Sequence, residues 1–194
     1  ASSGASGKPK RAASQSASDI KPGDWIRESV LGPSSNALHV MRAGLLGDGC
    51  LSRRRDWSAR YEEGHKATHE AYTAAVAGWI GGCGLEKRIS GYGSAMVALR
   101  SPASPLLTDL RAVWYPGGGT KRVPADLSWI DDFAVAKWFM DDGSLAHHEG
   151  QEDRALFATN GFTRDGVERL GAKLTALYGV RCTVYSSRGW ALRV

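Results

Sequence analysis

The sequence is poor in cysteine, and its three cysteines, Cys50, Cys83 and Cys182, lie far apart. An odd number of scattered cysteines predicts no disulfide framework, and the lack of a Cys-x-x-Cys pair argues against a structural zinc site. No apolar run approaches the roughly 18 residues that a membrane-spanning helix needs. These absences favour a soluble protein of a reducing, intracellular compartment.

Neither sign of charge dominates the chain, since 25 Lys and Arg residues face 20 Asp and Glu residues, for a net charge of +5. This mild basic bias permits a polyanionic partner without requiring one. The N-terminal 18 residues are Ala, Ser and Gly at thirteen positions, with three basic residues and no acid before Asp19. We assign residues 1–30 to a basic tail that is disordered unless bound.

Two origins suit this tail. It is predicted to be a linker or the remainder of a segment that targets a mitochondrion or chloroplast, because such segments are rich in serine, basic and poor in acids. If the tail is held, nucleic acid is the partner that suits its charge best.

Hydrophobic periodicity and glycine breaks divide the rest of the chain into two similar series of elements. The first series is predicted to contain helices at 36–46, 66–80 and 105–115, a strand at 57–62, and a hairpin at 85–89 and 95–100. The second is predicted to contain helices at 129–140 and 163–178, a strand at 155–159, and a hairpin at 180–185 and 190–194, with Thr163 as a helix cap. We therefore expect an α+β fold.

The two series indicate an internal duplication. Asp48 and Asp142 are 94 residues apart, and the triplets Ala98-Leu99-Arg100 and Ala191-Leu192-Arg193 are 93 residues apart. We expect residues 31–125 to form a first repeat and residues 126–194 a second. The second repeat lacks a segment that matches the last helix of the first.

The first helix of each series is followed by the same unusual combination, a carboxylate and then a glycine. Asp48 and Asp142 are electrostatically awkward there, because the C-terminal end of a helix carries partial negative charge. A divalent cation between the two helix ends would offset this charge with oxygen ligands from both acids. Small residues at Ala43, Gly44 and Ala136 would let the two helices approach closely. The alternative is that both acids simply belong to turns that end helices.

At residues 41–49 and 135–143 the sequence resembles the two diverged motifs of single-chain LAGLIDADG homing endonucleases, including those whose second motif reads WFMDDG. Segments 111–115, 121–124 and 157–163 resemble further parts of that family, and the resemblance runs from about residue 37 to the C-terminus. It implies a duplicated αββαββα pseudo-dimer, here without the last helix of the second repeat. The two motif helices would pack at a pseudo-twofold axis, and the sheets would form a saddle over the DNA major groove.

The resemblance also implies roles for individual residues. Asp48 and Asp142 match the metal-binding acids, and the backbone carbonyls of Gly47 and Asp141 would complete the shell of a Mg²⁺ or Mn²⁺ ion. Lys121 matches a basic residue near the active centre, which would polarise the attacking water or stabilise phosphate charge. The implied catalytic residues are therefore Asp48, Asp142 and Lys121, and the reaction is metal-assisted hydrolysis of a phosphodiester on each strand.

The sheet faces are expected to carry nucleic-acid recognition. Arginine can read guanine with two hydrogen bonds or hold phosphate, although a solvated surface charge is the alternative at each position. The candidates, among which the arginine run at 53–55 is favoured, are Arg53, Arg54, Arg55, Trp57, Arg60, Lys87, Arg88, Arg100, Arg154, Arg181, Tyr185 and Arg188.

Two functions fit this pattern. One is a sequence-specific, magnesium-dependent endonuclease of double-stranded DNA. The other is a non-cleaving relative that binds structured RNA in an organelle, as an intron-splicing maturase or as a component of a mitochondrial ribosome. The retained acids favour the first, whereas the basic tail and the missing helix favour the second. The protein is accordingly expected to be a monomer or a subunit of a ribonucleoprotein.

Two further patterns have plainer interpretations. His65 and His69 have a spacing that can bind zinc on a helix, but no second pair of ligands follows, so a surface histidine pair is the favoured interpretation. The segment His147-His148-Glu149, in the loop after the second motif, is expected to contact phosphate or solvent. Trp79, Trp114 and Trp138 are expected in the core.

Overall fold

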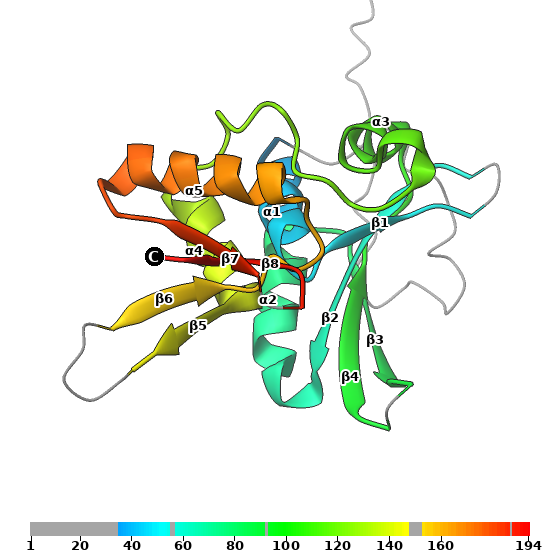
Figure 1. Cartoon of the computed structure of the whole chain (residues 1–194). Helices are drawn as coiled ribbons and strands as arrows, with labels where there is room; N and C mark the ends of the chain where they lie inside the picture. Colours follow the sequence, from blue (N-terminus) through cyan, green and yellow to red (C-terminus); the bar gives the residue numbers. More distant parts are fainter. Residues whose placement is uncertain (1–34, 55–56, 92, 148–152, 187) are drawn as a thin grey trace, which may run out of the picture.

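Two helices that pack against each other, α1 (Ser35–Leu46) and α4 (Asp132–Asp142), form the centre of the molecule, with one sheet on either side (Figure 1). The computed structural model describes residues 35–54, 57–91, 93–147, 153–186 and 188–194. Helix α1 is buried around most of its surface, since Ala37, Val40, Met41, Leu45 and Leu46 are all inaccessible to solvent or nearly so. A helix that is apolar on nearly all sides belongs in the middle of a core.

The two sheets share one topology, which confirms the duplication. The first contains β1 (Cys50–Ser52), β2 (Arg60–Lys66), β3 (Gly84–Ile89) and β4 (Ala95–Arg100), in the order β1-β2-β4-β3. The second contains β5 (Gly143–Ala146), β6 (Arg154–Phe157), β7 (Thr183–Ser186) and β8 (Trp190–Arg193), in the order β5-β6-β8-β7. All neighbouring strands are antiparallel. The matching triplets fall in β4 and β8, the corresponding strands of the two sheets.

The remaining helices complete an α+β architecture. Helices α2 (Glu70–Ile80) and α5 (Arg164–Tyr178) follow the second strand of each repeat, and α3 (Pro105–Trp114) follows the first sheet. Two short 3₁₀ helices, η3 (Ala67–His69) and η4 (Pro116–Gly118), precede α2 and follow α3. Among the described residues, no helix is long and apolar enough to cross a membrane, and all three cysteines are free.

Several element boundaries differ from the predicted ones for local reasons. The strand expected at 57–62 is β2 (Arg60–Lys66), so the helix expected from residue 66 begins only with η3 and α2. The helix expected from residue 129 begins at Asp132, because the side chain of Asp131 accepts a hydrogen bond from the Ala134 amide at 3.0 Å and caps it. Thr163 caps α5 as predicted, by accepting from the Gly166 amide.

The predicted tryptophan core is only partly confirmed. Trp114 and Trp138 are buried at 1% and 0% exposure, but Trp79 is 45% exposed and its placement in the core was wrong. Trp79 lies edge-on to the ring of Phe133, with ring centroids 5.7 Å apart. An aromatic residue near a helix end can pack with one ring face while the other contacts water.

The close approach of α1 and α4 occurs at a different residue from those predicted. Ala43 and Gly44 are buried, but Ala136 is exposed, so its expected place in the helix contact was wrong. The tight point is Gly47, where an added Cβ atom would lie 2.4 Å from the Cβ of Asp141. Gly44 instead makes room for the ring of Tyr61 on β2.

We expect Gly47→Ala to destabilise the protein by about 1–3 kcal/mol, because a methyl group there overpacks the contact between α1 and α4. Gly78→Ala is the matched control, because Gly78 is also helical but an added Cβ would meet nothing within 4 Å. That exchange should stabilise the protein by about 0.5–1 kcal/mol through helix propensity. Thermal unfolding of both variants tests this, and a Gly47→Ala protein as stable as the wild type would contradict the tight contact.

Candidate active site

The two motif acids lie at equivalent ends of the central helix pair. Asp48 lies two residues beyond Leu46, the last residue of α1, and Asp142 is the last residue of α4. Burial and then the charges of Asp48 and Asp141 raise the pKa of Asp142 from 3.8 to about 7. The structure therefore brings Asp48 close enough for its charge to disfavour the charged form of Asp142.

Lys121 is placed at the same point by the segment between α3 and α4. Its ammonium donates to the carbonyl oxygens of Gly47 at 2.9 Å and Gly49 at 3.0 Å, on either side of Asp48. Carbonyls at a helix C-terminus carry partial negative charge, so a lysine there stabilises the end of α1. Burial lowers the pKa of Lys121, and the neighbouring acids, Asp142 foremost, act against this. The three residues predicted to be catalytic thus occupy one site.

A buried ion cluster that the sequence did not predict lies beside these acids. Lys137 of α4 has no exposed surface, and its ammonium contacts both carboxylate oxygens of Glu63 on β2, at 2.9 and 3.0 Å. The same ammonium contacts both oxygens of Asp141, at 3.0 and 2.8 Å. The hydroxyl groups of Tyr61 and Tyr72 complete the cluster by donating to Glu63 and Asp141. We call Glu63, Lys137, Asp141, Tyr61 and Tyr72 the lysine cluster.

The lysine cluster joins the two repeats. Glu63, Tyr61 and Tyr72 come from the first repeat, while Lys137 and Asp141 come from the second motif helix. Burial would raise the pKa of Glu63, but the hydrogen bond from His65 and the charge of Lys137 outweigh burial and lower it to about 2. Burial raises the pKa of Asp141, and Lys137 offsets only part of this effect. A buried charge of this kind persists only where partners of opposite charge satisfy it.

His65 connects the lysine cluster to Asp48. Its Nε2 lies 2.7 Å from the Glu63 carboxylate, and its Nδ1 lies 3.2 Å from the Asp48 carboxylate. Burial lowers the pKa of His65, but its hydrogen bonds to Asp48 and Glu63 outweigh burial and raise it to about 9. The imidazolium form donates from both nitrogens, which is what two carboxylate neighbours require. The interpretation of His65 as half of a surface histidine pair was therefore wrong, although His69 is exposed as expected.

Two groups of donors at this site could hold a divalent cation. The ligating atoms of Glu63, His65 and Asp141 lie within 4.8 Å of one another, but the ammonium of Lys137 already lies between the carboxylates of Glu63 and Asp141. A metal ion could enter that group only by displacing a fully buried ammonium. Asp142 differs, because burial and then the charges of Asp48 and Asp141 raise its pKa. Carboxylates in that state fit a hard divalent cation.

The first sheet presents part of the predicted nucleic-acid surface. On β2, Tyr61, Glu63 and His65 point toward the helices, so Arg60 points to the opposite face. Strand register places Arg100 opposite Glu62, which is on the same face of β2 as Arg60. Arg88 and Lys66 both pair with Met96, so Arg88 lies on that face as well. Arg60, Arg88 and Arg100 therefore share the face turned away from the helices. Lys87 lies on the helix side instead, with its ammonium 2.9 Å from Glu70 of α2.

The second sheet also has arginines on the face turned away from the helices, and one of them was not among the predicted residues. Phe157 and Leu192 are buried and paired, so Arg154 on β6 and Arg193 on β8 point to the opposite face. The guanidinium of Arg193 lies over the ring of Tyr185, 5.8 Å from its centroid. Arg193 was missed, although the repeated triplet made it the counterpart of the candidate Arg100.

The other nucleic-acid candidates lie in connections. Arg53 and Arg54 follow β1 and are exposed, and the Nε of Arg53 donates to the carbonyl of Trp57 at 2.8 Å. Trp57 is 48% exposed, and Arg188 is exposed in the turn between β7 and β8, with a positive φ of 51°. Arg55 lies outside the described residues. Contact of these residues with nucleic acid stays a prediction.

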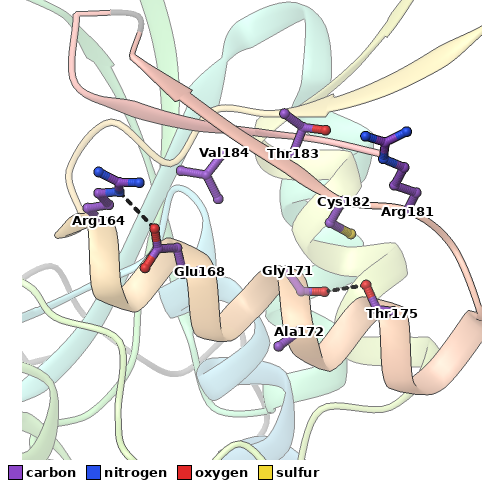
Figure 2. Close-up of a pocket in the computed structure, with 9 residues that line it drawn as sticks. All are labelled: Arg164, Glu168, Gly171, Ala172, Thr175, Arg181, Cys182, Thr183 and Val184. Atoms are coloured by element: carbon purple, nitrogen blue, oxygen red, sulfur yellow. Dashed lines mark hydrogen bonds and ion pairs between the residues drawn. The ribbon is translucent and has the colours of Figure 1, made fainter.

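A pocket of about 510 Å³ lies between α5 and β7 (Figure 2), and neither motif acid is among the residues that line it. Arg181, one of the nucleic-acid candidates, borders it. The polar side chains that α5 contributes are engaged within that helix, since Arg164 pairs with Glu168 and Thr175 donates to the carbonyl of Gly171. The pocket therefore lacks the converging polar groups of an active site. His147, the other loop candidate, pairs with Asp153 at 2.5 Å and is exposed, whereas His148 and Glu149 lie outside the described residues.

Asp142→Asn is expected to stabilise the metal-free protein at pH 8. The folded pKa of about 7 exceeds the usual 3.8, so the stability that protonated Asp142 contributes is present below pH 4 and lost as the pH rises through 7. Removing this charge should raise stability by on the order of 2 kcal/mol at pH 8, after allowance for partial exposure.

Thermal unfolding in a chelator at pH 8 and pH 4 tests this expectation. Asp142→Asn should unfold at a higher temperature than the wild type at pH 8, and the difference should be small at pH 4. Asp109→Asn is the control, because Asp109 is exposed on α3, and it should change neither value. A variant no more stable than the wild type at pH 8 would contradict the crowding of carboxylates around Asp142.

Comparison with known proteins agrees with this geometry. A model of the LAGLIDADG DNA endonuclease family matches residues 38–193. An uncharacterized protein of Methanocaldococcus jannaschii is 31% identical over 139 residues, covering 70% of this chain and 54% of its own length. The cytochrome b mRNA maturase bI2 of Debaryomyces hansenii is 26% identical over 163 residues, covering 77% of this chain and 60% of its own length. The chain thus spans little more than half the length of these curated relatives.

A solved structure shows the same fold. The homing endonuclease I-WcaI, bound to its DNA recognition sequence, superposes with a TM-score of 0.66 and 18% sequence identity, covering 86% of this chain and 77% of that one. At this identity the likeness concerns the fold alone. The family model spans most of the chain and includes both motif helices and both sheets. The chain belongs to the LAGLIDADG DNA endonuclease family.

Proposed function

We propose that this protein is a sequence-specific endonuclease that cuts double-stranded DNA with the help of Mg²⁺ or Mn²⁺. One observation carries the proposal. Asp48 lies just beyond the end of α1 and Asp142 at the end of α4, and the two carboxylates lie close enough that the charge of Asp48 adds to burial in raising the pKa of Asp142. Two acids that crowd one another beside a lysine are suited to a divalent cation and a phosphate.

The residues of the chain have distinct parts in this proposal. Asp48 and Asp142 supply the carboxylate oxygens that hold the cation. When bound, the cation would activate water and offset charge on the leaving oxygen. Lys121, fixed by the carbonyls of Gly47 and Gly49, offers a positive charge next to the acids, where it can stabilise a phosphate. The carbonyls of Gly47 and Asp141 are proposed as further ligands, although Gly47 would have to share its oxygen with Lys121.

The two sheet faces are proposed to bind the DNA on either side of this site. Arg60, Arg88 and Arg100 of the first sheet have counterparts in Arg154 and Arg193 of the second. Two of these arginines pair with acids, since Arg60 lies 3.1 Å from Glu62 and Arg100 lies 2.5 Å from Glu86. Phosphates could replace these surface acids as partners, because exposed ion pairs contribute little stability.

RNA binding is the second candidate, and the similarity to a cytochrome b mRNA maturase favours it. In that case the same basic faces would hold structured RNA, as an intron-splicing factor or within a ribonucleoprotein. That the protein is located in an organelle stays a prediction. That it is a monomer or a subunit of a ribonucleoprotein also stays a prediction.

Selection from randomised pools tests the proposed function. Duplex DNA and RNA pools are enriched separately for binding in Ca²⁺, and the bound molecules are then offered Mg²⁺. We expect one duplex sequence to be enriched and cut at a fixed position, and the Asp48→Asn protein to enrich the same sequence without cutting it. Enrichment of RNA alone, or DNA binding without cleavage in Mg²⁺ or Mn²⁺, would contradict the proposal, the former in favour of the RNA-binding function.

A further inference from the structure

His65 occupies an unusual position between two carboxylates. It lies on β2 among the residues that face the helices, and its side chain is 5% exposed. Nε2 contacts Glu63 at 2.7 Å and Nδ1 contacts Asp48 at 3.2 Å. Both ring nitrogens are therefore engaged, one with a buried acid and the other with a motif acid.

The buried end of this contact is firmly held. Glu63 receives the ammonium of Lys137 on both of its oxygens and the hydroxyl of Tyr61. The imidazole also packs edge-on against the ring of Tyr72, with centroids 5.0 Å apart. The His65 ring is thus held by Glu63 of β2 and Tyr72 of α2, and Lys137 of α4 acts on it through Glu63.

The other end of the contact lies near the surface. The Asp48 side chain is 39% exposed, and it follows the last turn of α1 rather than lying within it. Lys121 fixes the backbone on either side, through the carbonyls of Gly47 and Gly49, but these bonds leave the carboxylate free to rotate. The hydrogen bond from His65 restrains that rotation.

We propose that His65 is a positioning residue, which holds the Asp48 carboxylate in the orientation that binds the divalent cation. Glu63 and Lys137 hold His65 in turn, so a lysine of the second motif helix orients the acid of the first. This inference rests on the proposed function, because it takes Asp48 as a cation ligand. Hydrogen-bond partners of metal ligands commonly contribute 10- to 100-fold in metal affinity or activity.

Titration of the metal-free protein with Mn²⁺, followed by electron paramagnetic resonance, tests the inference. His65→Leu removes both hydrogen bonds and should weaken Mn²⁺ binding by about 10- to 100-fold. His65→Gln keeps one donor and should recover part of this loss. His69→Gln is the matched control, because His69 lies four residues away and is exposed, and it should bind Mn²⁺ as the wild type does.

A second background separates positioning from folding. In an Asp48→Asn protein, His65→Leu should have no further effect on Mn²⁺ affinity, because the carboxylate that it positions is gone. If His65 were needed only for folding, His65→Leu would instead weaken Mn²⁺ binding in both backgrounds, in step with a lower unfolding temperature. Wild-type Mn²⁺ affinity in His65→Leu, together with weakened binding in Asp48→Asn, would overturn the role of His65 alone. Unchanged Mn²⁺ affinity in Asp48→Asn would overturn the proposed metal site and this inference with it.

Discussion

Asp48→Asn is expected to lower the rate of DNA cleavage by about 10³-fold or more while leaving DNA binding nearly unchanged. A cation at a phosphoryl centre supplies several kcal/mol of charge stabilisation, and about 4 kcal/mol corresponds to a factor of 10³ in rate. Asn is similar in size to Asp but a far weaker ligand for a hard cation. The measurement is single-turnover cleavage of the selected duplex in Mg²⁺, with binding measured separately in Ca²⁺.

The same loss is expected for Asp142→Asn, because both acids belong to one site. Asp109→Asn is the control for both, since it removes an exposed charge on α3, outside both motifs. DNA binding should stay the same or tighten slightly, because the variants remove negative charge near phosphate. Cleavage at the wild-type rate by either variant would contradict its assignment as a cation ligand.

Lys137→Met is expected to destabilise the protein by about 3–5 kcal/mol, since it leaves two buried carboxylates without their shared cation. For a chain of this length that loss corresponds to a fall of roughly 6–20 °C in the unfolding temperature. Lys87→Met is the matched control, because the ion pair of Lys87 with Glu70 is exposed. It should cost less than about 1 kcal/mol.

A compensated variant shows whether the charge itself is responsible. Lys137→Met combined with Glu63→Gln and Asp141→Asn removes all three formal charges and should regain much of the lost stability, because buried neutral groups need only hydrogen bonds. Thermal unfolding of the single, control and triple variants provides the comparison. A single variant as stable as the wild type would show that the lysine cluster contributes nothing to the packing of the two repeats.

The fold could be predicted from the sequence because its signals are local or repeated. Each helix that ends in a carboxylate and a glycine is visible in a short window, and the order of elements recurs at a nearly constant offset. Thr163 was recognised as a cap by its residue type and position, and the hairpin at β3 and β4 by its alternation and glycines. Such patterns depend on neighbours along the chain, and the structure keeps them.

The lysine cluster could not be predicted in this way. Glu63 and His65 occupy inward positions of β2, where the usual strand pattern places apolar residues. Their partner Lys137 lies 74 residues from Glu63 in the sequence, within a motif helix whose other features suggested only close packing. Polar residues on the inner face of a strand become intelligible only when the opposite charge is placed against them by the fold.

The residues of the candidate site also differ in how far the sequence could place them. The motif acids and Lys121 were identified from the motifs and the family resemblance, and the structure brings them together. The surface arginines were identified by charge alone, so the sequence could not separate Lys87, on the helix side, from Arg88, on the opposite face. One residue of register decides that difference.

The most direct test of the proposed site is to locate the cation. Crystals of the protein with its selected duplex, grown with Mn²⁺, would reveal the ion by its anomalous scattering. We expect a peak in contact with the carboxylates of both Asp48 and Asp142, with Lys137 still between Glu63 and Asp141. A peak within the group of Glu63, His65 and Asp141, or no peak near either motif acid, would contradict the account.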